Sequence, residues 1–124
     1  PIYSTVDNCY TNMEALVRLI DDNHGFIPPD EFIPIAEKNG DIIAIGEIVL
    51  EKVCEFTELY HPQDYGIKRI HVNLSVVQCM QENITASLSN IIKRHNIPFG
   101  FIDFEITETT ADNTNDRLEK IMNI

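Results

Sequence analysis

The stretch Lys68-Arg69-Ile70-His71-Val72-Asn73-Leu74-Ser75 sets the interpretation of the whole chain. Side chains on a β-strand alternate between the two faces of the sheet. Three polar side chains therefore lie on the face opposite Val72 and Leu74, namely His71, Asn73 and Ser75. This alternation predicts a strand with one apolar and one polar face.

Helices are predicted on both sides of this strand. Asp41 is expected to cap a long helix that His61-Pro62 ends, with its acidic face toward solvent and a buried stripe of Ile42, Ile45, Val49, Val53 and Phe56. A shorter helix is expected from Pro28-Pro29 to Gly40, because proline favours the start of a helix and glycine its end. After the strand, Asn83 opens a helix that stops before Pro98.

Further strands are predicted near both ends of the chain. Residues 2–18 are expected to form an antiparallel pair that ends in Met13-Glu14-Ala15-Leu16-Val17-Arg18, and residues 101–107 form another strand. Thr114 or Asn115 is expected to cap a last helix. Strands that alternate with helices at this spacing predict βα units and a mostly parallel sheet, hence an α/β fold. The 124 residues suffice for one small domain with a core.

Composition narrows the class of partner. Apolar residues make up 44% of the chain, and the formal net charge is −11, which argues against DNA or RNA because phosphate backbones need clustered Lys and Arg. A small phosphate ligand held through divalent cations stays open. No signal peptide or membrane-spanning run is found, and the chain begins at Pro1, so a processed chain or a fragment is expected. Cys9, Cys54 and Cys79 predict reduced thiols in a cytoplasmic protein.

Candidate site residues lie at or near strand ends, where βα folds form their active sites. On a strand, Glu14, Leu16 and Arg18 share one face, so a carboxylate for a hard metal lies near a guanidinium for a phosphate. The alternative is a solvated strand edge with two scattered charges. Asn73 and Glu105 add two oxygen ligands to Glu14. A set of three oxygen ligands suits Mg²⁺ or Mn²⁺ and not zinc.

Four motifs follow one another along essentially the whole chain. They are Glu14-Ala15-Leu16-Val17-Arg18, the segment Phe32-Ile33-Pro34-Ile35-Ala36-Glu37-Lys38-Asn39-Gly40, Val72-Asn73-Leu74-Ser75 with Gln78, and Phe104-Glu105-Ile106-Thr107-Glu108. Together they resemble the EAL domain, the bacterial phosphodiesterase of cyclic di-GMP.

The resemblance implies a TIM-like (β/α) barrel whose first strand runs against the others. It implies that Glu14, Asn73 and Glu105 are metal ligands, that Arg18 and Leu16 hold the phosphate and base of cyclic di-GMP, and that Glu108 steadies a loop near the metals. The implied reaction is hydrolysis of one phosphodiester bond to linear pGpG, with two metals activating the water.

The resemblance also implies that residues 1–124 are the N-terminal half of the domain, truncated before a strand with paired aspartates. That strand, a lysine, a further glutamate ligand and a late glutamine are not in this sequence, nor is the glutamine expected before Pro1. A barrel of this kind needs about 250 residues. The chain alone is therefore expected to lack activity and to form a homodimer or aggregate through its unpaired sheet edge.

Two rival interpretations accompany the enzyme. A degenerate EAL domain would serve as a cyclic di-GMP receptor or protein-interaction module, and a structural half-barrel would bind neither metal nor nucleotide. The parent protein could carry a sensory or GGDEF-type domain and a membrane anchor elsewhere. His71 is expected to hydrogen-bond near the metal site and not to bind the metal. Asp103 is expected to be a polar group lower in the barrel or capped by a neighbouring strand, and Lys68 and Arg69 are expected to be solvated.

Overall fold

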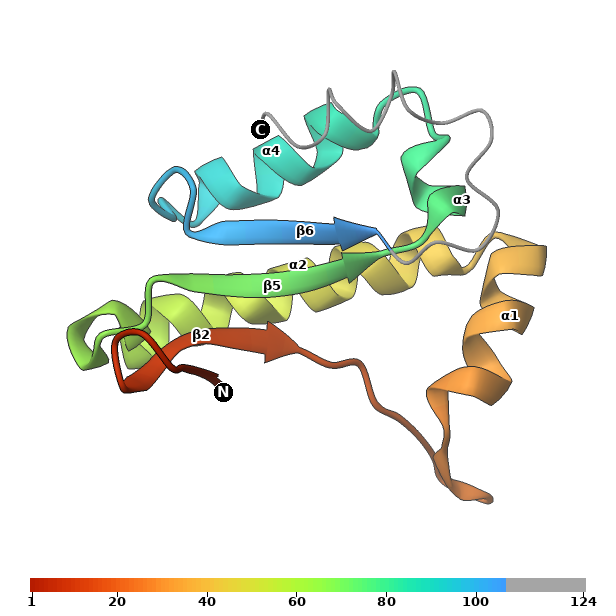
Figure 1. Cartoon of the computed structure of the whole chain (residues 1–124). Helices are drawn as coiled ribbons and strands as arrows, with labels where there is room; N and C mark the ends of the chain where they lie inside the picture. Colours follow the sequence, from red (N-terminus) through yellow and green to blue (C-terminus); the bar gives the residue numbers. More distant parts are fainter. Residues whose placement is uncertain (107–124) are drawn as a thin grey trace.

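The structure is a computed structural model that describes residues 1–106 (Figure 1). Its elements, in chain order, are β1 (Ile2–Ser4), β2 (Cys9–Ala15), β3 (Leu19–Asp21), β4 (Gly25–Ile27), α1 (Pro29–Asn39), α2 (Ile42–Tyr60), the 3₁₀ turn η1 (Pro62–Tyr65), β5 (Arg69–Leu74), α3 (Val76–Cys79), α4 (Ile84–Arg94) and β6 (Ile102–Ile106). The predicted last helix and Glu108 lie outside the described residues.

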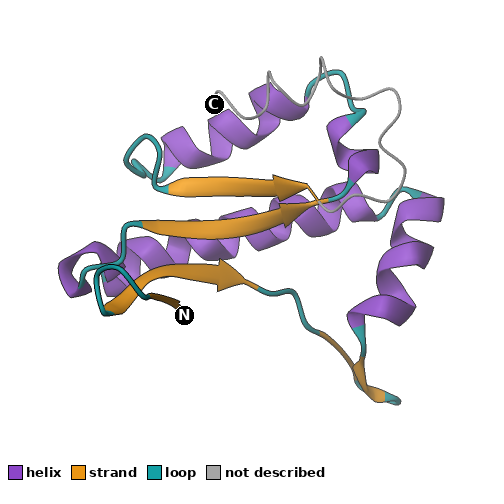
Figure 2. Ribbon diagram, in the orientation of Figure 1, coloured by secondary structure: helices purple, strands orange, loops and turns teal. Residues whose placement is uncertain are grey.

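The main sheet has the strand order β1-β2-β5-β6. The short β1 runs antiparallel to β2, whereas β2, β5 and β6 are parallel to one another. Parallel neighbours need long crossovers, and α1 with α2 supplies the first while α3 with α4 supplies the second (Figure 2). The predicted antiparallel opening pair, parallel sheet and α/β class are confirmed.

One face of the sheet builds the core with α2 and α4. Ile70, Val72 and Leu74 of β5 are almost fully buried, and they belong to one cluster with Leu50 of α2 and Leu88 of α4. The polar residues of β5 lie on the opposite face, as the alternation predicts. Within the described part of the chain, no helix is long and apolar enough to cross a membrane.

The buried stripe of α2 differs in part from the prediction. Ile42 and Val53 are buried, but Phe56 is 38% exposed, and the most buried residues are Leu50 and Cys54. α2 packs against α4 and α3 as well as β5, which turns the centre of its buried stripe away from Phe56. Hydrophobic periodicity predicts that a helix has a buried stripe, but it does not predict the centre of the stripe when several elements pack against the same helix.

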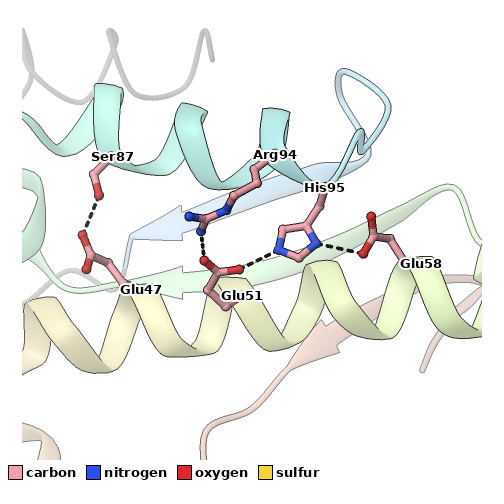
Figure 3. Close-up of polar contacts among 6 residues, drawn as sticks. All are labelled: Glu47, Glu51, Glu58, Ser87, Arg94 and His95. Atoms are coloured by element: carbon pink, nitrogen blue, oxygen red, sulfur yellow. Dashed lines mark hydrogen bonds and ion pairs between the residues drawn. The ribbon is translucent and has the colours of Figure 1, made fainter.

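The acidic face of α2 contacts α4, so the prediction that it only faces solvent is wrong. His95, just after α4, lies between two carboxylates, with Nε2 2.6 Å from Glu51 and Nδ1 2.8 Å from Glu58 (Figure 3). Arg94 also pairs with Glu51, and the Ser87 hydroxyl donates to Glu47. These contacts join two helices distant in sequence.

The sequence patterns do not predict a short β-hairpin or a single helical turn that the structure contains. Leu19–Asp21 and Gly25–Ile27 pair as a hairpin, in which the Asp21 carboxylate accepts from the backbone N–H groups of Asn23 and His24. Val76–Cys79 forms one helical turn with Ser75 and Gln78 as a capping box. Both are too short to give a periodic signal in sequence.

Candidate functional site

The candidate site lies on the polar face of the sheet, at the carboxyl ends of three parallel strands. Glu14 of β2 pairs in register with His71 of β5, and Asn73 of β5 pairs with Glu105 of β6. Side chains two residues apart on one strand share a face, so all four lie on the same side. The parallel register therefore brings Glu14, Asn73 and Glu105 to one end of the sheet.

Direct contacts connect these side chains. The Asn73 amide donates to Glu14 at 3.0 Å. Glu105 lies beside His71, whose Nδ1 is 2.8 Å from a Glu105 carboxylate oxygen. Both glutamates are exposed, whereas His71 is largely buried. Two carboxylates thus remain open to a ligand at this end of the sheet.

Farther from the carboxyl ends of the strands, charged side chains form ion pairs. Asp103 forms an ion pair with Arg69 at 2.9 Å, which confirms the expectation that a neighbouring strand caps it. Lys68, just before β5, lies 3.3 Å from Asp7 in the β1–β2 turn. Lys68 and Arg69 are each more than half exposed, which confirms the prediction that they are solvated charges, and each also forms an ion pair.

Leu16 and Arg18 do not continue the strand, in contrast to the prediction. The pairing of β2 with β5 ends at Ala15, and the chain then leaves the sheet toward the β3–β4 hairpin beside α1 (Figure 1). The shared face of Glu14, Leu16 and Arg18 cannot be inferred from strand alternation beyond Ala15. Arg18 is exposed and donates to the Val17 carbonyl at 2.9 Å.

Leu16 and Arg18 border a pocket of about 200 Å³ that reaches Asn73. Its inner wall holds a buried polar network in which the Ser75 hydroxyl donates to Glu37 at 2.5 Å and the Gln78 side chain accepts from the Ser75 backbone N–H at 2.9 Å. The sequence placed Glu37 only within a motif and gave no signal of its contact with Ser75, because α1 and β5 are distant along the chain.

Gly46 of α2 allows Gln78 to enter this wall. A Cβ atom at position 46 would lie 1.8 Å from Gln78 Nε2, so any side chain there collides with it. Gln78 is 3% exposed and completes the capping box that starts α3. The packing of α2 against α3 thus fixes the turn that follows Asn73.

The oxygen donors of the site are suited to binding a hard metal ion. Glu14, Asn73 and Glu105 offer carboxylate and amide oxygens, which Mg²⁺ and Mn²⁺ prefer. Residues 1–106 contain no group of three His, Cys, Asp or Glu side chains placed to hold a metal. The buried His71 Nδ1 also has no hydrogen-bond partner of acceptable geometry among them. These residues fit part of a metal shell.

The two buried cysteines do not supply a nucleophile. All three are free thiols, and Cys54 and Cys79 are buried. Burial raises the pKa of Cys54 to about 11, with Glu58 and Glu55 adding to the effect, and burial also raises the pKa of Cys79. A thiol with a raised pKa stays protonated and unreactive near neutral pH.

Comparison with known proteins decides the family. The EAL domain model matches residues 1–124. The chain belongs to the EAL domain family. Among curated EAL relatives, the bifunctional diguanylate cyclase/cyclic di-GMP phosphodiesterase MucR of Pseudomonas aeruginosa is 37% identical over 99 residues, which are 80% of this chain and 14% of that protein. Cyclic di-GMP phosphodiesterase PdeR of Escherichia coli is 34% identical over 79% of this chain and 15% of its own length.

Solved EAL structures share the fold. The P. aeruginosa MucR phosphodiesterase in complex with c-di-GMP superposes with a TM-score of 0.77 at 36% identity, over 87% of this chain and 45% of that one. The EAL enzyme Bd1971, at 22% identity and a TM-score of 0.75, supports the fold alone. The predicted fold is confirmed, since the chain has the arrangement of the N-terminal part of a TIM-like barrel. The chain spans less than half of the MucR domain in that structure.

Proposed function

We propose that this EAL chain is the N-terminal half of a metal-dependent phosphodiesterase domain that hydrolyses cyclic di-GMP to linear pGpG. Its relatives support the substrate, because MucR and PdeR are named cyclic di-GMP phosphodiesterases and the similar MucR structure holds c-di-GMP. One observation carries the proposal. Glu14, Asn73 and Glu105 meet at the carboxyl ends of adjacent parallel strands, and Asn73 hydrogen-bonds Glu14.

In this proposal Glu14, Asn73 and Glu105 hold Mg²⁺ or Mn²⁺. Such an ion, when bound, lowers the pKa of a water and stabilises negative charge on phosphate oxygens. Glu14 and Glu105 contribute the negative charge that retains the cation. Asn73 contributes a neutral oxygen, while its N–H orients Glu14. Glu108 has the loop-stabilising role that the family motif assigns to its position.

Leu16 and Arg18 bind the substrate in this proposal. Arg18 is exposed, lies beside the pocket that reaches Asn73, and forms no ion pair with any described carboxylate. A guanidinium free of a carboxylate partner can donate paired N–H groups to a phosphate. Leu16 is 55% exposed at the same pocket and offers an apolar surface to a base.

The proposal extends to the parent protein. The curated relatives are about seven times longer than the matched segment, and MucR combines cyclase and phosphodiesterase activities in its name. A sensory or GGDEF-type domain in the same parent chain and a cytoplasmic site of action fit a second-messenger enzyme. We expect the 124-residue chain by itself to lack activity, because residues 1–106 offer only part of a metal shell.

The test uses the full-length protein with cyclic di-GMP and Mn²⁺. The expected result is pGpG formation by the wild type and a loss of about 100-fold or more in Glu14→Gln and Glu105→Gln, as for removal of a metal ligand. Glu55→Gln, an exposed carboxylate on α2, is the matched control. Turnover by the purified 124-residue chain, or full activity in Glu14→Gln, contradicts the proposal.

A cyclic di-GMP receptor is the second candidate, and the pocket that Leu16 and Arg18 border is the observation in its favour. Binding of cyclic di-GMP that Arg18→Ala abolishes, without pGpG formation at any Mn²⁺ concentration, would favour the receptor. The intact set of Glu14, Asn73 and Glu105 favours the enzyme.

A further inference from the structure

We propose that His71 is a positioning residue that fixes the Glu105 carboxylate for metal binding. The inference rests on the function proposed above, since it assigns a role toward the same metal site. His71 occupies the middle of the three-strand ladder, where its register partners are Glu14 on one side and Asp103 on the other. Its side chain is 16% exposed, so its ring is held within the polar face.

The contact with Asn12 determines which ring nitrogen carries the proton. The Asn12 side-chain Nδ2 lies 3.0 Å from His71 Nε2. An amide NH₂ group only donates, so Nε2 must accept with its lone pair. In a neutral imidazole the single proton then resides on Nδ1. The N–H group of His71 therefore faces the Glu105 side of the ring.

Glu105 is the acceptor available to this N–H group. Its carboxylate oxygen lies 2.8 Å from Nδ1, but the angle does not meet hydrogen-bond geometry, and the buried Nδ1 has no other described partner. The carboxylates of the two register partners of His71 are engaged elsewhere, since Asp103 is paired with Arg69 and Glu14 accepts from Asn73. The Glu105 side chain is 52% exposed and can rotate to accept the hydrogen bond. A buried donor without an acceptor is costly, which favours this rotation.

This contact has a consequence for the metal site. A carboxylate that accepts a hydrogen bond on one oxygen keeps the other oxygen directed at the metal, and partners of this kind typically change metal affinity or activity by about 10–100-fold. The contact with Asn12 in turn fixes the tautomer of His71. Asn12, His71 and Glu105 thus form a chain of side chains from β2 through β5 to β6.

Two substitutions separate this role from simple space filling. In His71→Asn the side-chain amide nitrogen replaces Nδ1 and keeps a donor toward Glu105. In His71→Gln the side-chain amide oxygen takes the place of Nε2 and accepts from Asn12, so only the contact with Asn12 is kept and no donor stands at the Nδ1 position. Mn²⁺ binding to the full-length protein is measured without nucleotide, by calorimetry and by electron paramagnetic resonance. The expected result is affinity within about threefold of the wild type for His71→Asn and a loss of about 10–100-fold for His71→Gln.

Kinetics supply a second readout. In His71→Gln the Mn²⁺ concentration for half-maximal activity rises, while KM for cyclic di-GMP stays within about twofold because the variant leaves Arg18 unchanged. Equal Mn²⁺ affinity in His71→Gln and the wild type overturns the inference, and so does an equal loss in both variants. A failure of the proposed function differs, because then the wild type itself binds no Mn²⁺, or Glu105→Gln binds it unchanged.

Discussion

The Asn73 side chain donates a 3.0 Å hydrogen bond to the Glu14 carboxylate, joining two residues that are 59 positions apart in sequence. The bond crosses from β5 to β2 at the open end of the parallel sheet. It is exposed, so its contribution to folding stability is small, and its main effect is to orient Glu14. Stability and activity should therefore respond differently when it is removed.

Asn73→Ala should abolish most activity of the full-length protein and barely change its stability. We expect a free energy of unfolding lowered by about 0.5–1 kcal/mol, the typical net worth of a hydrogen bond. Activity should fall by about 100-fold, because both a metal ligand and the orientation of Glu14 are lost. Asn90→Ala, an exposed asparagine on α4, is the control. A large drop in the urea midpoint with retained activity would contradict this role.

Gly46→Ala should destabilise the protein although alanine favours helices. The new Cβ would lie 1.8 Å from Gln78 Nε2 and would force the Gln78 side chain out of the capping box. Overpacking of this kind costs about 1–3 kcal/mol, which exceeds the helix-propensity gain of about 1 kcal/mol. Urea unfolding measures the change.

A double-variant cycle isolates the collision. Gln78→Ala removes the obstructing side chain, so Gly46→Ala should cost much less in the Gln78→Ala background than in the wild type. Independent, additive effects of the two substitutions would show that Gly46 and Gln78 do not interact.

Much of the fold follows from sequence because its signals are local and periodic. β5 alternates apolar and polar residues, and α4 carries its apolar residues at helical spacing, so both were predicted within two residues of their bounds. The end of β2 was not predictable. Leu16 and Val17 suit a strand, but the pairing of β2 with β5 stops at Ala15. The last partner, Val72, is 57 residues away from Ala15, so the local sequence does not show where the pairing ends.

The site residues were predictable in type but not in contacts. Glu14, Asn73 and Glu105 follow from strand ends and family motifs, and their meeting follows from the parallel register. Two contacts were not predicted, that of Glu37 with Ser75 and that of His95 with Glu51. Both depend on how helices pack in the folded chain, and the residues near each partner in the sequence give no signal of this packing. Ion pairs between distant elements are therefore the part that sequence reasoning missed.

His95→Ala should loosen the docking of α4 on α2 without affecting the metal site. His95 is 16% exposed and bridges Glu51 and Glu58, so its loss leaves two carboxylates without their shared partner. We expect a free energy of unfolding lowered by about 1–2 kcal/mol. Mn²⁺ affinity should stay unchanged, because the cluster lies between helices and not on the polar face of the sheet. Lys93→Ala, exposed on the same helix, is the control.

The cysteines should differ in reactivity in the folded protein. Cys9 is exposed and should react with a thiol reagent within the mixing time, whereas Cys54 and Cys79 should react only after unfolding. Counting fast and slow thiols at pH 8 with and without urea measures this. Fast reaction of all three thiols in native buffer would contradict the packing of α2 and α3.

Alkaline pH should weaken the fold through Cys54. Its pKa is raised from 9.0 to about 11 by burial, so the folded state favours the protonated thiol. This contribution is complete below pH 9 and is lost progressively as pH rises from about 9 to 11. Cys54→Ala should flatten the decline of the urea midpoint over this range, and an unchanged slope would contradict the assignment.

The 124-residue chain alone should self-associate. Within residues 1–106, β6 has one strand neighbour, β5, so its other edge offers unpaired backbone groups. Large apolar side chains are also exposed, Phe99 at 87% and Leu59 at 69%. Sedimentation velocity should show a dimer or larger species whose share rises with protein concentration. The full-length protein at the same concentration is the control. A monodisperse monomer of the isolated chain that melts cooperatively would contradict this prediction, because the unpaired edge of β6 would then be stable without a partner.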